Sequence, residues 1–216
     1  MLRSLRFVAL FGGLILSASA LAVDIDAASY GYPLTNPFEA TIATTPPDLR
    51  PELPLDDDID QQTRSVTLRP EREFQLPDNF WPVKKLTYRI ATQEKAAPLI
   101  FLIAGTGARY DSSINEYLKK LYYKAGYHVV QLSSPTSFDF MSAASRFATP
   151  GITKEDAEDM YRVMQAVRAQ NPNVPVTDYY LSGYSLGALD AAFVAHLDET
   201  RRSFNFKKVL LLNPPV

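Results

Sequence analysis

The sequence predicts an α/β fold, a three-layer sandwich with a mostly parallel central sheet. Short β-prone apolar runs alternate along the chain with amphipathic segments of helical length, as they do where right-handed crossovers join strands and helices. Two of the runs, residues 98–104 and 208–212, are almost continuously apolar, which is typical of parallel strands covered on both faces. We therefore expect helices on both faces of one sheet.

Each predicted element has its own pattern. Alternation of polar and apolar residues indicates a half-buried strand at 64–68, and an apolar stripe indicates a helix at 113–124. The stripe of that helix contains Ile114, Tyr117, Leu118 and Leu121. The buried face predicted for a later helix contains Met160, Val163, Met164 and Val167. In chain order the elements are strands at 64–68, 85–91 and 98–104, a helix at 113–124, a strand at 127–132, a polar and aromatic loop at 133–150, a helix from 153, a turn at 171–175, a strand at 179–182, another helix and a strand at 208–212.

Composition limits the kinds of partner. The chain has 216 residues, which is enough for one domain with a substantial core. Its formal net charge of −2 gives no basic surface for nucleic acid. The sequence contains no cysteine, so it can form neither disulfides nor a thiolate metal site, and it has no N-terminal cysteine for a lipid anchor.

The first 22 residues have the form of a signal peptide. Arg3 and Arg6 precede an apolar run at 7–16, and Ala20-Leu21-Ala22 fits the A-x-A rule for cleavage after Ala22. The apolar run is shorter than the roughly 20 residues that a membrane-spanning helix needs. We therefore expect an exported, periplasmic protein.

Residues 23–62 are predicted to be a proline-rich, extended linker. Six prolines interrupt every helical or strand period, and proline lacks the N–H that a sheet interior requires. The acidic run at 56–60 lacks the glycine and the distal glutamate of a calcium loop, so a solvated charged linker is expected. The folded domain is then expected to run from 63 to 216.

The most informative stretch is Gly183-Tyr184-Ser185-Leu186-Gly187, between a β-prone strand and a helix-like segment. A serine at the apex of such a turn is lifted above the sheet, and its glycines avoid clashes between strand and helix. The N–H groups at the start of the helix would face negative charge that develops near Ser185. This context predicts that Ser185 is a nucleophile. The alternative is a plain strand-to-helix turn with a capping serine.

A second glycine turn, Gly105-Thr106-Gly107, follows the apolar run at 98–104. With both motifs in this order, residues 85–216 resemble the first half to two-thirds of an α/β-hydrolase. The resemblance implies an oxyanion hole formed by the backbone N–H of Thr106 (or Gly107) and that of Leu186. The turn does not fit either phosphate-loop pattern.

The resemblance implies an exported serine hydrolase that cleaves carboxylic esters, thioesters or amides through an acyl-serine intermediate. The apolar content of the loop at 133–150 favours a small-molecule ester, lipid-like or aryl, as substrate. The alternative is that the aromatic residues of this loop simply pack on the core. No metal or organic cofactor is indicated. The expected substrate-binding residues are Gly105, Gly107, Tyr184 and Phe138.

The sequence departs from the family pattern at the general base. In this family the acid and then the histidine follow the serine. Of the two histidines, His128 precedes Ser185 in a predicted strand, and His196 lies eleven residues after it, roughly 16 Å along a helix. Neither can serve as the base. Asp190 and Asp198 are expected on the helix surface.

Two interpretations remain. In the first, the chain is a fragment, and its hydrolase domain is incomplete because the acid and histidine lie beyond it. In the second, the chain is a catalytically inactive, hydrolase-like envelope protein that uses residues 23–62 and the sheet edge to bind a protein or lipid partner.

Overall fold

The computed structural model describes residues 34–43, 50–68 and 83–215. The chain divides into two units, Met1–Pro51 and Glu52–Val216. In the first, the described residues form a short helix, α1 (Pro37–Ala43). The expected signal peptide at 1–22 lies outside the described residues. No helix in the described ranges has the length and apolar character needed to cross a membrane.

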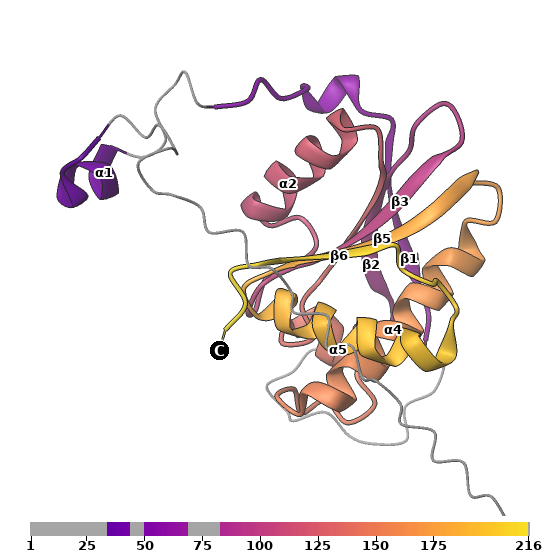
Figure 1. Ribbon diagram of the computed structural model, residues 1–216. Helices are drawn as coiled ribbons and strands as arrows, with labels where there is room; N and C mark the ends of the chain where they lie inside the picture. The colour runs from indigo at the N-terminus through magenta and orange to yellow at the C-terminus, as the bar shows by residue number, and fades with distance from the viewer. Residues whose placement is uncertain (1–33, 44–49, 69–82, 216) are drawn as a thin grey trace, which may run out of the picture. The chain divides into compact units, whose positions relative to one another are not determined.

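The second unit contains a six-stranded sheet in the order β1-β2-β4-β3-β5-β6. The pairs β1–β2 and β2–β4 are antiparallel, whereas β4, β3, β5 and β6 run parallel to one another. Helix α2 covers one face and helices α4 and α5 cover the other (Figure 1). The predicted three-layer α/β fold with a mostly parallel sheet is therefore confirmed. The strands are β1 (Gln61–Val66), β2 (Leu86–Ala91), β3 (Ala97–Ile103), β4 (His128–Leu132), β5 (Val176–Tyr184) and β6 (Lys208–Leu212).

The helices of this unit match the sequence patterns closely. The helix predicted at 113–124 forms with those bounds, and the one predicted from 153 begins there. The loop predicted at 133–150 also contains a short helix whose Phe140 is fully buried, so part of this loop belongs to the core. The helical segments are the 3-10 turn η2 (Asp56–Asp58), α2 (Ser113–Lys124), α3 (Phe138–Ala143), α4 (Thr153–Gln170) and α5 (Leu186–Arg201).

The main core lies between the sheet and helices α4 and α5. Phe101 of β3 and Leu181 of β5 are fully buried there. Burying a side chain of this size contributes about 1.5–3 kcal/mol. The four residues predicted as the buried face of α4 all belong to this core, as predicted: Met160, Val163, Met164 and Val167.

Helix α2 packs only partly as predicted: Leu118 of the predicted stripe is buried, but two other members of the stripe are exposed. Ile114 and Tyr117 are 39% and 46% exposed, whereas Asn115 and Lys119 are buried. The Lys119 ammonium donates hydrogen bonds to Glu116 and to Gln61, each at 2.7 Å. A buried charge is tolerated when it is paired and hydrogen-bonded. These contacts turn the polar side of α2 inward.

The acidic run at 56–60 also differs from the expected solvated linker. Asp56 forms ion pairs with Lys119 at 3.4 Å and Lys120 at 3.3 Å. The hydrogen bond from Lys120 is the main reason why the pKa of Asp56 is lowered. Ile59 is buried, and β1 begins at Gln61, so the boundary expected at residue 62 falls inside a strand. The segment expected to be extended also contains α1 and η2.

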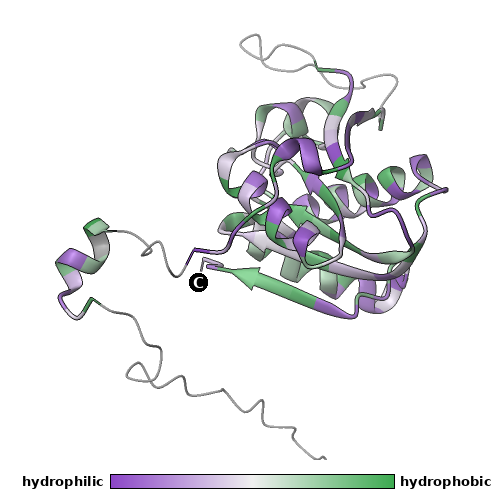
Figure 2. Cartoon of the chain, turned by 90° about the horizontal axis from the view of Figure 1, so that it is seen from above, coloured by the Kyte–Doolittle hydropathy of each residue, from purple (hydrophilic) through white to green (hydrophobic). Residues whose placement is uncertain are grey.

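Strand β6 was predicted to be buried, but Leu210 and Leu211 are 47% and 39% exposed. Figure 2 shows this hydrophobic strand at the border of the sheet, next to the C-terminus. In the described part of the chain it pairs with β5 alone. Successive residues of a strand point to opposite faces, so both faces are partly open at this edge.

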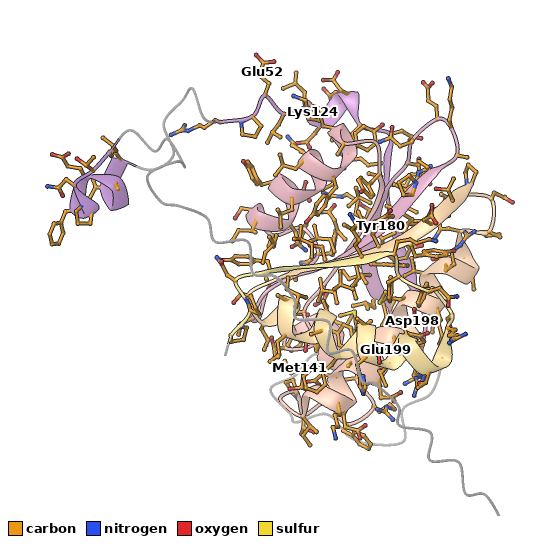
Figure 3. The ribbon with its side chains drawn as sticks, viewed as in Figure 1. Glu52, Lys124, Met141, Tyr180, Asp198 and Glu199 are labelled. Atoms are coloured by element: carbon orange, nitrogen blue, oxygen red, sulfur yellow. The ribbon has the colours of Figure 1, made fainter. Side chains whose placement is uncertain are left out.

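Asp198 is buried, contrary to the prediction that it lies on the helix surface. Its carboxylate accepts hydrogen bonds from the Tyr161 hydroxyl at 2.6 Å and from the backbone N–H of Phe204 at 3.0 Å and Phe206 at 3.3 Å. Asp198 therefore links α4 and α5 to the loop that precedes β6. Its neighbour Glu199 is exposed (Figure 3).

We predict that Asp198→Ala lowers the free energy of unfolding by about 2–4 kcal/mol, because three donors lose their buried acceptor. Urea unfolding would measure the change. Glu199→Ala removes the adjacent, exposed carboxylate and should change stability by less than about 0.5 kcal/mol. Equal effects of the two substitutions would contradict the role given to Asp198.

Candidate functional site

Ser185 stands between the last residue of β5 and the first residue of α5. Its backbone has φ 54° and ψ −125°, an unfavourable conformation for a residue with a Cβ. Two hydrogen bonds of 2.9 Å hold it: the Ser185 N–H donates to the Leu212 carbonyl of β6, and the Ser185 carbonyl accepts from Ala188 N–H. The side chain is half-buried, and its hydroxyl has no hydrogen-bond partner among the described residues.

Gly183 and Gly187 allow the helix to pass very close to the sheet. A Cβ on Gly183 would lie 2.0 Å from the Gly187 carbonyl oxygen. A Cβ on Gly187 would lie 2.4 Å from the carbonyl oxygens of Ile103 and Ala104. No side chain fits at either distance, so both positions require glycine because of close packing.

The turn after β3 lies beside Ser185. The Ala108 N–H donates to the Gly105 carbonyl at 3.0 Å, and Gly107 has φ +66°. Thr106 has no positive φ, so the turn is of type II, with glycine at the position that requires it. A Cβ on Gly105 would lie 3.3 Å from the Ser185 Cβ. The structure thus brings the two predicted motifs together.

Tyr184 also lies against the turn at Gly105. A Cβ on Gly105 would lie 3.2 Å from both the ring and the carbonyl oxygen of Tyr184. Phe138 is the first residue of α3, on the segment that follows β4. Because β3, β4 and β5 are parallel, the segments that follow them all start at the carboxyl ends of these strands, on the same side of the sheet.

Backbone N–H groups near Ser185 differ in whether they are occupied. The Gly107 N–H donates to the Thr136 hydroxyl at 2.8 Å. Within the described ranges, the N–H groups of Thr106 and Leu186 have no acceptor. Leu186 is the first residue of α5, where an N–H has no partner inside the helix. These two groups are therefore available to an external acceptor.

Neither histidine lies at Ser185. His128 is the first residue of β4, at the N-terminal end of the parallel strands and opposite the end where Ser185 lies, and it is fully buried. Its Nδ1 accepts from the Gln93 N–H at 3.0 Å, and its Nε2 donates to the Pro175 carbonyl at 3.2 Å. Burial lowers the pKa of His128. His196 is exposed on α5 beside Glu199.

Asp190 is buried, contrary to the prediction that it lies on the helix surface. It is 1% exposed, and its Oδ2 has no hydrogen-bond partner among the described residues. Burial, and secondarily the charge of Asp156, raise its pKa to about 7. Asp156 is also buried and accepts from the Gly151 N–H at 2.8 Å. Below about pH 7 the carboxyl of Asp190, five residues after Ser185 on α5, is therefore protonated.

One pattern in the sequence marks both aspartates as buried. Asp190 and Asp198 fall on the stripe of α5 that the structure buries. The spacing of this stripe follows the helical period. Its members are Gly187, Ala188, Asp190, Ala191, Val194 and Asp198.

The cavity at the far end of α5 holds no unpaired buried carboxylate. A cavity of about 520 Å³ lies between the C-terminal half of α5 and β6, but the Asp198 oxygens beside it are taken by the donors described above. In the part of the chain that the structure describes, no group of three or more histidine, aspartate or glutamate side chains is arranged to hold a metal ion.

Gly187→Ala tests the close packing. Helix propensity alone favours alanine by about 1 kcal/mol. We predict instead a loss of more than about 2 kcal/mol in unfolding free energy, because the added Cβ overlaps backbone. Ala192→Gly in the same helix measures how much the difference in helix propensity between alanine and glycine contributes to stability. Stabilisation by Gly187→Ala in urea unfolding would contradict this packing.

Asp190→Asn tests the buried carboxyl. A raised pKa in the folded state means that wild-type stability is fully present below pH 3.8 and is lost as the pH rises to about 7. As the pH rises through this window, the unfolding free energy of Asp190→Asn should therefore increase relative to that of wild type by roughly a few kcal/mol. Urea unfolding at several pH values measures the difference, with Asp57→Asn as an exposed control. A constant difference between variant and wild type would refute the prediction.

Comparison with known proteins supports the fold. No protein-family model and no curated protein matches the chain. Est1E from Butyrivibrio proteoclasticus is 17% identical, with 60% of this chain and 47% of that chain covered and a TM-score of 0.45. Brefeldin A esterase, a bacterial homologue of human hormone-sensitive lipase, is 16% identical over 77% and 43% of the two chains, with a TM-score of 0.54. An esterase of Pyrococcus furiosus is 16% identical over 74% and 53%, with a TM-score of 0.50.

The chain thus spans about half the length of the solved structures that it matches. At these identities the likeness concerns the fold. As the sequence predicted, the chain has the fold of the α/β-hydrolases.

Proposed function

We propose that this protein is a serine hydrolase that cleaves carboxylic esters through an acyl-serine intermediate, with Ser185 as the nucleophile. The observation that carries the proposal is the turn at Ser185. It holds an unpaired hydroxyl in a strained backbone beside the turn after β3. Strain of this kind costs about 1–3 kcal/mol and is characteristic of functional positions.

In the proposed reaction, the Ser185 Oγ attacks the carbonyl carbon of the ester and passes its proton to a base. The carbonyl oxygen gains a negative charge, which the N–H groups of Thr106 and Leu186 stabilise. Both groups lack acceptors among the described residues. The alcohol leaves with a proton, and water then hydrolyses the acyl-serine. Loss of one such donor typically costs about 10²–10³ in turnover.

The base is proposed to come from outside these 216 residues. His128 is buried and hydrogen-bonded at the N-terminal end of the parallel strands, and His196 points to solvent eleven residues along α5. The chain covers 43% of the length of brefeldin A esterase and 53% of the length of the Pyrococcus furiosus esterase. A longer protein in which an acid and a histidine follow this chain would complete the site.

The substrate is proposed to be a small ester with apolar groups. Phe138 is 38% exposed at the start of α3, and Tyr184 is half-buried beside Gly105. These two aromatic residues could line the acyl or alcohol side of the site, with Gly105 and Gly107 at its base. The pattern at residues 1–22 supports export to the periplasm.

A second candidate function is binding without catalysis. Leu210 and Leu211 of β6 favour it, because in the described part of the chain this strand pairs with β5 alone and its other side can pair with a partner. In that case the protein is an inactive envelope component. The two candidates differ in whether Ser185 reacts with an electrophile.

Labelling with a fluorophosphonate probe separates them. We predict that the product of the whole reading frame is labelled, that Ser185→Ala abolishes labelling, and that the 216-residue chain is not labelled because it lacks the base. Ser203→Ala, which removes an exposed serine from the loop after α5, should label like wild type. If a folded wild-type protein of the whole frame stays unlabelled, the hydrolase proposal fails.

A further inference from the structure

The turn that carries Thr106 is tied to the segment after β4. The Gly107 N–H donates to the Thr136 hydroxyl at 2.8 Å, and the Ser134 N–H donates to the Ala108 carbonyl at 2.9 Å. Strands β3 and β4 are parallel neighbours, so the segments that follow them both start at the carboxyl end of this strand pair. The bond from Gly107 crosses 29 positions of sequence.

The Thr136 hydroxyl is itself held in place. The Ser134 and Thr136 hydroxyls are 2.8 Å apart, and the Thr136 N–H donates to the Ser134 Oγ at 3.2 Å. The Ser134 carbonyl accepts from both the N–H and the hydroxyl of Ser137, and Ser134 and Ser137 are buried. A buried polar support of this kind fixes the position of an acceptor.

This acceptor determines which N–H groups of the turn remain available. With its bond to Thr136, the Gly107 N–H is occupied, and the Thr106 N–H has no acceptor in the described ranges. The bond also fixes the peptide plane between Thr106 and Gly107. If that plane rotated to give a type I turn, the Gly107 N–H would leave Thr136 and the Thr106 carbonyl oxygen would replace it.

We propose that Thr136 is a positioning residue for the oxyanion hole. Its hydroxyl accepts from the Gly107 N–H, keeps the turn in its type II form, and leaves the Thr106 N–H as the donor beside Ser185. This inference rests on the proposed serine hydrolase function and adds to it a residue that would not contact the substrate.

Amide hydrogen exchange tests the structural half of the proposal and needs no activity. In the 216-residue chain, the Gly107 amide should be protected. Thr136→Val keeps the shape but removes the acceptor, so we expect Gly107 to exchange at least about tenfold faster. Thr136→Ala removes the same hydroxyl without a branched side chain and should behave alike. Thr136→Ser should restore protection. Thr200→Val, at an exposed helix position, is the control, and strand amides report on folding.

Labelling rates at Ser185 test the functional half, in the product of the whole reading frame. Thr136→Val should slow fluorophosphonate labelling by about tenfold or more, less than the roughly 10²–10³ for the removal of an oxyanion donor, and Thr136→Ser should recover the rate. With an ester substrate, the loss should appear in kcat and not in KM.

The outcomes separate this inference from the proposed function. If wild type labels through Ser185 and Thr136→Val labels equally fast, Thr136 has no positioning role and the hydrolase function stands. Unprotected Gly107 in folded wild type also overturns the inference. If wild type does not label, both proposals fall.

Discussion

The close approach of α5 to the ends of β3 and β5 is the constraint on which the proposed site depends. Gly183 and Gly187 permit it, since a Cβ at either position would lie 2.0–2.4 Å from a backbone oxygen. This approach forces Ser185 into a conformation with φ 54°. It also places the start of α5 directly after the serine, where the N–H of Leu186 has no acceptor among the described residues. Packing thus accounts for both the position of the Ser185 hydroxyl and one of the two candidate donors of the oxyanion hole.

The rest of the site is built from the parallel strands around this contact. The segment after β3 contributes Thr106, the segment after β4 holds that turn through Thr136, and the last residue of β6 accepts from the Ser185 N–H. The carboxyl ends of these parallel strands lie on the same side of the sheet. Asp190, buried within α5, adds a carboxyl that is neutral below about pH 7. The stability of the helix behind the serine should therefore depend on pH.

The sequence was a good guide where local pattern decides structure. Apolar runs gave the strands of the sheet, and the two glycine motifs placed Ser185 beside the turn after β3. It failed where partners come from distant segments. Burial of Lys119 depends on acceptors on η2, β1 and its own helix, and the acceptor for the Gly107 N–H is supplied by Thr136, 29 positions away. The prediction that Asp190 lies on the helix surface was wrong, because it rested on the charge of the residue and not on its position in the buried stripe of α5.

A crystal structure of the phosphonylated protein of the whole reading frame would test the central claim most directly. The account predicts that phosphorus is bonded to the Ser185 Oγ, and that the phosphoryl oxygen lies about 2.7–3.1 Å from the N–H groups of Thr106 and Leu186. The Gly107 N–H should remain on Thr136. A phosphoryl oxygen that points to solvent, or an adduct on another residue, would contradict the account.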